Sequence, residues 1–78
     1  MEIKVYTTSW CPECINSKRF MKENNLKFDE IDIEEKNMNR DDLEKVTGGR
    51  TVPQIVIDGK TIGGYNNLIL LYQKGEIR

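Results

Sequence analysis

Cys11-Pro12-Glu13-Cys14 follows a short run of strand-forming residues and begins a helical pattern. This junction constrains the fold strongly, because a strand, a tight loop and a helix must meet at the two thiols. The backbone N–H groups of a helix N-terminus have no partner within the helix, and the positive end of the helix dipole stabilises a thiolate there. Pro12 suits the first helical position, since proline lacks an N–H and has a fixed φ. The motif therefore predicts a redox-active dithiol at the start of a helix, with Cys11 as the nucleophile at its exposed end.

Two other roles for the cysteine pair remain open from the motif alone. A C-x-x-C motif can supply half of a zinc site, but this chain has no histidine and no third cysteine. The remaining ligands would come from Asp, Glu or a second subunit, because zinc prefers four ligands. A structural disulfide across so few residues removes little entropy from the unfolded chain. Redox chemistry is the favoured interpretation.

Length and composition predict one small domain, residues 1–78, with no linker or repeat. The net charge of −1 gives no basic stripe, so we expect no nucleic-acid partner. No segment approaches the roughly 20 apolar residues of a membrane span, and the N-terminus has no apolar signal-peptide region. We therefore expect a cytoplasmic protein without membrane association, in a compartment where a lone C-x-x-C tends to be catalytic.

The hydrophobic pattern predicts four strands and three helices in the order β-α-β-α-β-β-α. The predicted strands are 3–7, 27–33, 54–57 and 60–62, and the predicted helices are 11–24, 39–46 and 66–73. Leu43 and Val46 are expected to face inward from the second helix, and Asp58-Gly59 to form a hairpin turn. The first β-α-β unit requires parallel pairing and the hairpin adds antiparallel strands, so the fold class is α/β with a four-stranded mixed sheet and flanking helices.

With the motifs placed on these elements, the chain resembles the glutaredoxins, within the thioredoxin-like superfamily, over nearly its whole length. The landmarks are Tyr6-Thr7, Cys11-Pro12-x-Cys14, Thr51-Val52-Pro53 and Gly63-Gly64. The resemblance implies a thiol–disulfide oxidoreductase in which Cys14 resolves the mixed disulfide formed at Cys11. It also implies that Pro53 follows a cis peptide bond, that the Val52 backbone pairs with a substrate cysteine, and that Gly63 and Gly64 allow close approach of the bound thiol. It implies disulfide-containing proteins as partners, a monomer, no tightly bound cofactor, and glutathione or another small thiol as co-substrate.

The same resemblance identifies candidate substrate contacts around the dithiol. They are Trp10, Pro12, Glu13, Arg40, Arg50, Thr51, Val52, Pro53, Gly63, Gly64, Tyr65, Asn66 and Asn67. Arg50 matches a family position that contacts glutathione, and Arg40 stands where the family often has a glutamine that faces the glycine carboxylate, so two cations are expected at that end of the tripeptide. Other charged contacts of the family are absent: Thr8 stands where a lysine is usual, and Asn66 and Asn67 stand where an aspartate often grips the ammonium group.

Two residues of the motif depart from the family in other ways. Glu13 replaces a common tyrosine, and its carboxylate opposes a thiolate at the helix terminus. Trp10 is similar to the tryptophan before the nucleophile in thioredoxins and mycoredoxins, and its indole suits a docking surface.

These departures leave two alternatives open. One is a redoxin reduced by a thioredoxin-reductase-like donor or by a thiol other than glutathione. The other is a dimeric binding module in which each subunit contributes Cys11 to an iron–sulfur cluster or a zinc ion.

Overall fold

The computed structural model describes residues 1–77 and has the predicted order of elements. The strands are β1 (Ile3–Thr7), β2 (Asp29–Asp32), β3 (Gln54–Ile57) and β4 (Lys60–Gly63), and the helices are α1 (Pro12–Glu23), α2 (Arg40–Thr47) and α3 (Tyr65–Gln73). The sheet order is β2-β1-β3-β4. β1 pairs parallel with β2 and antiparallel with β3, and β3 pairs antiparallel with β4. The predicted α/β class and mixed sheet are therefore confirmed.

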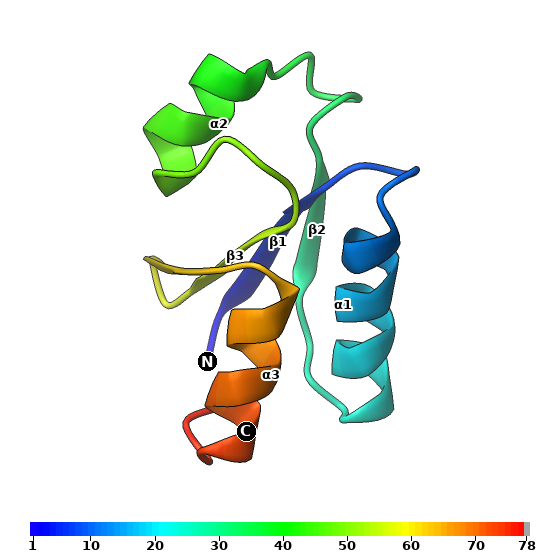
Figure 1. Ribbon diagram of the computed structural model, residues 1–78, viewed down its shortest axis with the longest axis vertical. Helices are drawn as coiled ribbons and strands as arrows, with labels where there is room; N and C mark the ends of the chain where they lie inside the picture. Colours follow the sequence, from blue (N-terminus) through cyan, green and yellow to red (C-terminus); the bar gives the residue numbers. More distant parts are fainter. Residues whose placement is uncertain (78) are drawn as a thin grey trace.

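Two hydrophobic clusters fill the two faces of the sheet. Val5 and Ile55 pack with Met21 of α1 and Leu68 of α3 in the larger cluster. Tyr6, the next residue along β1, packs instead with Leu43 of α2 in the smaller cluster. Successive strand side chains point to opposite faces, so one strand serves both clusters. Figure 1 accordingly shows α1 and α3 side by side, with α2 apart from them.

Local sequence signals account for the ends of the elements. Cys11 caps α1 with Pro12 at the first helical position, as predicted. Asn39 and Asp42 form a reciprocal capping box at the start of α2, and Gly48 ends that helix with a φ of 84°. Asp58 and Gly59 both have positive φ, which matches the hairpin turn predicted between β3 and β4. Each turn therefore forms where the sequence provides a residue that tolerates it.

Several bounds of the predicted elements, and the inward orientation of Val46, are wrong. β2 is shorter than the predicted strand 27–33, because only Asp29–Asp32 pair with β1. α2 is shifted by one residue and ends at Thr47, whereas α3 begins one residue early at Tyr65 and ends at Gln73 as predicted. Val46 is 55% exposed rather than inward. Leu43 and Thr47 share the inner face of α2 at the four-residue spacing of a helix, and Thr47 can be buried because its hydroxyl donates to the Leu43 carbonyl at 2.8 Å.

No helix within residues 1–77 has the length and apolar character needed to cross a membrane.

Candidate active site

Cys11 occupies the N-cap position where the loop after β1 enters α1. Its backbone is extended, with φ −83° and ψ 117°, and its Sγ accepts a hydrogen bond from the Cys14 backbone N–H at 3.3 Å. The sulfur therefore takes the place of the side-chain oxygen that usually caps a helix. An N–H donor and the positive end of the helix dipole both point at this sulfur, so negative charge that develops on Cys11 during a reaction is stabilised there.

The two cysteines, both free thiols here, differ less in exposure than the sequence suggests. Cys11 is 5% exposed and Cys14 is fully buried, so the expectation of an openly exposed nucleophile is wrong. The sulfur also contacts the carbonyl oxygen of Val52, a residue distant in the chain, which the sequence pattern does not reveal. Burial raises the pKa of the Cys14 thiol, and the neighbouring Cys11 side chain raises it further. Cys14 therefore stays a thiol at neutral pH until a reaction draws its proton away.

The segment before β3 forms the opposite wall of the site. The Val52–Pro53 peptide bond is cis, as the family resemblance implies. The Cys11 thiol donates to the Val52 carbonyl oxygen across 3.6 Å, although the two residues are 41 positions apart. Gly64 lies close to Pro53, because a Cβ at Gly64 would contact the Pro53 carbonyl oxygen at 3.5 Å. The fold thus gathers the dithiol, Val52, Pro53 and Gly64 in one place.

A cavity of about 290 Å³ is lined in part by Thr8 and Trp10 of the loop that precedes Cys11, and by Glu34, Arg40, Arg50 and Val52. Trp10 is 62% exposed, and its indole N–H donates to the Glu34 carboxylate at 3.1 Å. Glu34 is not among the site residues that the sequence predicts. No local signal identifies this residue, because the contact joins segments 24 residues apart.

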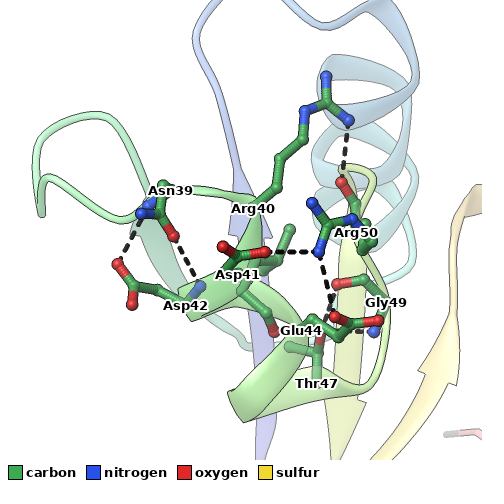
Figure 2. Close-up of polar contacts among 9 residues, drawn as sticks. Asn39, Arg40, Asp41, Asp42, Glu44, Thr47, Gly49 and Arg50 are labelled. Carbon is green, nitrogen blue, oxygen red and sulfur yellow. Dashed lines mark hydrogen bonds and ion pairs between the residues drawn. The ribbon is translucent and has the colours of Figure 1, made fainter.

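Arg40 and Arg50 bind each other's segments, as Figure 2 shows. Arg40 donates from NH1 to the Arg50 carbonyl oxygen at 3.0 Å. Arg50 reaches back to α2 and forms ion pairs with Asp41 at 2.7 Å and with Glu44 at 3.1 Å. Hydrogen bonding to Asp41, and then to Glu44, raises the pKa of the Arg50 guanidinium. Both arginines line the cavity, but Arg50 already has two carboxylate partners.

Three uncharged residues at family positions that usually carry a charge have different surroundings in the structure: Thr8, Asn66 and Asn67. Thr8 is 2% exposed, and its hydroxyl has no hydrogen-bond partner among residues 1–77. Asn67 donates from its amide to the Ile62 carbonyl oxygen at 2.9 Å, and its side chain fills the space beside Gly63, whose φ is 109°. Asn66, the preceding residue, is exposed in the first turn of α3. Asn67 therefore supports the turn between β4 and α3, and Asn66 faces solvent.

The remaining candidate residues differ in exposure. Pro12 and Glu13 are exposed in the first turn of α1, and Thr51 is exposed before the cis bond. Tyr65 is half-buried at the start of α3. No group of three Cys, His, Asp or Glu side chains in the described part of the chain is arranged to hold a metal ion.

A dithiol at a helix N-terminus, facing the residue before a cis-proline in an α/β sheet, defines the chain as a thioredoxin-like redox protein. Comparison with known proteins gives the family. The glutaredoxin family model matches residues 3–62. A glutaredoxin of Pseudomonas aeruginosa is 36% identical over 75 residues, covering 96% of this chain and 89% of the relative. Glutaredoxin 3 of Escherichia coli is 34% identical over 75 residues, covering 96% and 90%.

Solved structures agree with this relationship. Wheat glutaredoxin superimposes with a TM-score of 0.82 at 31% identity, covering 95% of this chain and 73% of the wheat chain. The reduced Escherichia coli glutaredoxin gives a TM-score of 0.79 at 26% identity, covering 95% of both chains. The chain belongs to the glutaredoxin family and is a thiol–disulfide oxidoreductase with a Cys-x-x-Cys active site.

Proposed function

We propose that this glutaredoxin reduces protein disulfides through Cys11 and Cys14 and is itself reduced by glutathione. The Cys11 thiolate attacks one sulfur of a substrate disulfide and forms a mixed disulfide, while the other substrate sulfur leaves as a thiol after taking a proton. Cys14 then loses its proton and attacks the Cys11 sulfur, which releases the second substrate thiol. The two electrons pass to the substrate, and the protein is left oxidised with a Cys11–Cys14 disulfide. Two glutathione molecules return them and become glutathione disulfide.

The hydrogen bond from the Cys14 backbone N–H to Cys11 Sγ carries this assignment of roles. It stabilises negative charge on Cys11 alone, whereas Cys14 is fully buried and its pKa is raised. The Val52 carbonyl beside Cys11 is the backbone acceptor that an extended substrate segment meets on entering the site. The thiol that attacks first must reach the substrate, and Cys11, at the N-cap of α1 and 5% exposed, is the more accessible of the two.

Glutathione as the reductant is supported by the family and by one structural relative. A buckwheat glutaredoxin solved in complex with glutathione superimposes with a TM-score of 0.82 at 25% identity, covering 95% of this chain and 70% of that one. Arg40 supplies a cation beside the cavity. Thr8 and Asn66 supply none of the charge usual at their positions, and Arg50 is already paired. We therefore expect glutathione to reduce this protein slowly for a glutaredoxin.

The proposal extends to the setting in which the protein works. We propose a single domain, residues 1–78, that acts as a monomer in the cytoplasm and holds no tightly bound cofactor. The cytoplasm is a reducing compartment that keeps thiols reduced, and this chemistry needs the dithiol to be reduced between turnovers. Purified protein that is coloured and dimeric would contradict the monomer and would favour a cluster bound through the Cys11 residues of two subunits.

One experiment tests the reductant directly. The protein is oxidised to the Cys11–Cys14 disulfide and offered glutathione, or NADPH with thioredoxin reductase, or a small thiol without carboxylates. We expect glutathione at millimolar concentration to restore both thiols and thioredoxin reductase to leave the disulfide intact. Rapid reduction by thioredoxin reductase together with no reaction with glutathione would contradict the proposal.

A further inference from the structure

The paired state of Arg50 distinguishes two cations that the sequence makes look equivalent. Arg40 and Arg50 lie ten positions apart, one at the start of α2 and the other just before Thr51. Their contacts are unequal. Arg40 donates to a neutral carbonyl oxygen, so its charge is uncompensated by that bond, whereas Arg50 contacts two carboxylates at 2.7 and 3.1 Å. The positive charge available to a ligand in the cavity is therefore chiefly that of Arg40.

The two carboxylates lie outside the cavity that the arginines line. Arg40 and Arg50 are among its lining residues, and Asp41 and Glu44 are not. Asp41 and Glu44 thus contact the side of the Arg50 guanidinium that faces α2, as Figure 2 shows. They reduce the positive potential of the cavity without touching a molecule inside it. Solvent screens such an effect but does not abolish it, because the charges lie within a Debye length of about 8 to 10 Å.

We propose that Asp41 and Glu44 are specificity-determining residues. By compensating the charge of Arg50, they weaken the binding of thiols that place a carboxylate in the cavity lined by Arg40 and Arg50. The inference rests on the proposed reaction with glutathione and deepens it, because it names the feature of the thiol that the site disfavours. This weakening does not apply to small thiols that lack the carboxylate, or to cysteines within a protein chain. The proposal thus assigns the slow step with glutathione to weak binding at one end of the molecule rather than to the dithiol.

A double variant, Asp41→Asn with Glu44→Gln, tests this by freeing Arg50 while keeping the shape of both side chains. The rate constant for reduction of the oxidised protein is measured with glutathione and with glutathione whose glycine carboxyl is amidated. We expect the double variant to react about three- to tenfold faster than the parent with glutathione, and less than about twofold faster with the amide. An equal gain with both thiols, or none with glutathione, would overturn the inference.

A charge-matched control separates the local effect from the overall change in charge. Glu23→Gln with Glu76→Gln removes the same two negative charges at exposed positions, at the end of α1 and beyond α3. We expect this control to react with glutathione within about twofold of the parent, because its charges lie away from the cavity. A control that gains as much as the double variant would show that net charge alone governs the reaction, against the inference.

Adding Arg50→Gln to the parent and to the double variant gives a mutant cycle that decides whether the gain acts through Arg50. Arg50→Gln in the parent should slow the reaction with glutathione by a smaller factor than it does in the double variant, because part of the Arg50 charge is already compensated by Asp41 and Glu44. The same change in the double variant should remove most of the gain. If Arg50→Gln instead slows every thiol alike in the parent, the Arg50 pairs position Val52 and do not select the thiol, and the inference fails.

Failure of the inference is distinguishable from failure of the proposed function. A parent that glutathione does not reduce contradicts the proposed reductant, but the double variant still tests the inference by gaining or not gaining that reaction. A parent that glutathione reduces, with no response to Asp41→Asn and Glu44→Gln, supports the function and rejects the inference. Urea denaturation of each variant confirms that the compared proteins are folded.

Discussion

The indole N–H of Trp10 donates a 3.1 Å hydrogen bond to the carboxylate of Glu34, a residue 24 positions later in the chain. This bond holds an exposed aromatic ring next to Cys11, on the rim of the cavity beside the dithiol. A large side chain that is exposed yet held in place loses little conformational entropy when a partner docks on it. We therefore expect Trp10 to serve as a preformed docking surface for a protein substrate.

Removing the acceptor should release the ring. We expect Glu34→Ala to lower kcat/KM for a protein disulfide about two- to fivefold, because the indole must then be ordered on binding. Trp10 is the only tryptophan of the chain, so fluorescence anisotropy reports its mobility directly. Glu35→Ala, one residue further along the same turn, is the control and should leave both measurements near the parent values. Equal effects of the two variants would reject the assigned role of Glu34.

The two thiols should react at very different rates with an alkylating agent. At about pH 7 we expect iodoacetamide to modify Cys11 more than about tenfold faster than Cys14, because Cys11 lies at the helix N-terminus whereas burial raises the pKa of the Cys14 thiol. Peptide mass spectrometry after timed quenching measures both rates. Cys14→Ser should also accumulate mixed disulfides at Cys11, while Cys11→Ser should accumulate none. Faster labelling of Cys14 would reverse the assignment of nucleophile and resolving thiol.

The raised pKa of Cys14 makes the stability of the reduced protein depend on alkaline pH. An unfolded cysteine loses its proton near pH 8.5, whereas the folded Cys14 keeps its proton to higher pH. Above about pH 8.5 the folded state therefore binds more protons than the unfolded state, and the free energy of unfolding falls as pH rises. Below about pH 7.5 both states are protonated at this thiol, so Cys14 contributes no pH dependence there.

Urea denaturation under reducing conditions between pH 7 and 10 measures this decline. Cys14→Ser should show a shallower decline than the parent over the same range, since all other titrating groups are shared. Parallel curves for the parent and Cys14→Ser would show that the Cys14 proton is not linked to folding.

Two neighbouring asparagines should respond oppositely to the same substitution. Asn66→Asp places a carboxylate in the first turn of α3, which contains no acidic residue. It should stabilise the fold by about 0.3 to 1 kcal/mol and speed reduction by glutathione about two- to fivefold. Asn67→Asp removes the donor to the Ile62 carbonyl and should cost about 1 kcal/mol. Urea midpoints and glutathione rates measure both effects, and an Asn67→Asp variant more stable than the parent would contradict the structural role given to Asn67.

Glu13 should restrain the nucleophile through its charge alone. It is exposed in the first turn of α1, next to the N-terminus that stabilises the Cys11 thiolate. We expect Glu13→Gln to speed alkylation of Cys11 at pH 7 and low salt by less than about tenfold, and 1 M salt to remove most of the gain. Glu23→Gln at the other end of the same helix should have no such effect. A gain that survives high salt would indicate a steric rather than an electrostatic cause.

The sequence by itself determined the elements and the reactive pair. The strand, loop and helix at Cys11 and the hairpin at Asp58 are set by interactions between residues close in the chain, such as caps, turns and hydrophobic period. The element ends shifted by a few residues because pairing with β1 decides where β2 ends. The prediction that Val46 lies on the inner face of α2 is wrong, because a helix of two turns is too short for its hydrophobic periodicity to define that face.

Only the tertiary structure decided how the reactive pair is enclosed and which charges reach its cavity. The contact of Cys11 with Val52 spans 41 residues, and the burial of Cys11 follows from that long-range closure. The sequence presents Arg40 and Arg50 as two similar cations, but the return of the chain after α2 places Arg50 against Asp41 and Glu44. Ion pairs of this kind depend on distances between side chains that local propensity does not specify, so the electrostatic character of the cavity emerges only when the chain has folded.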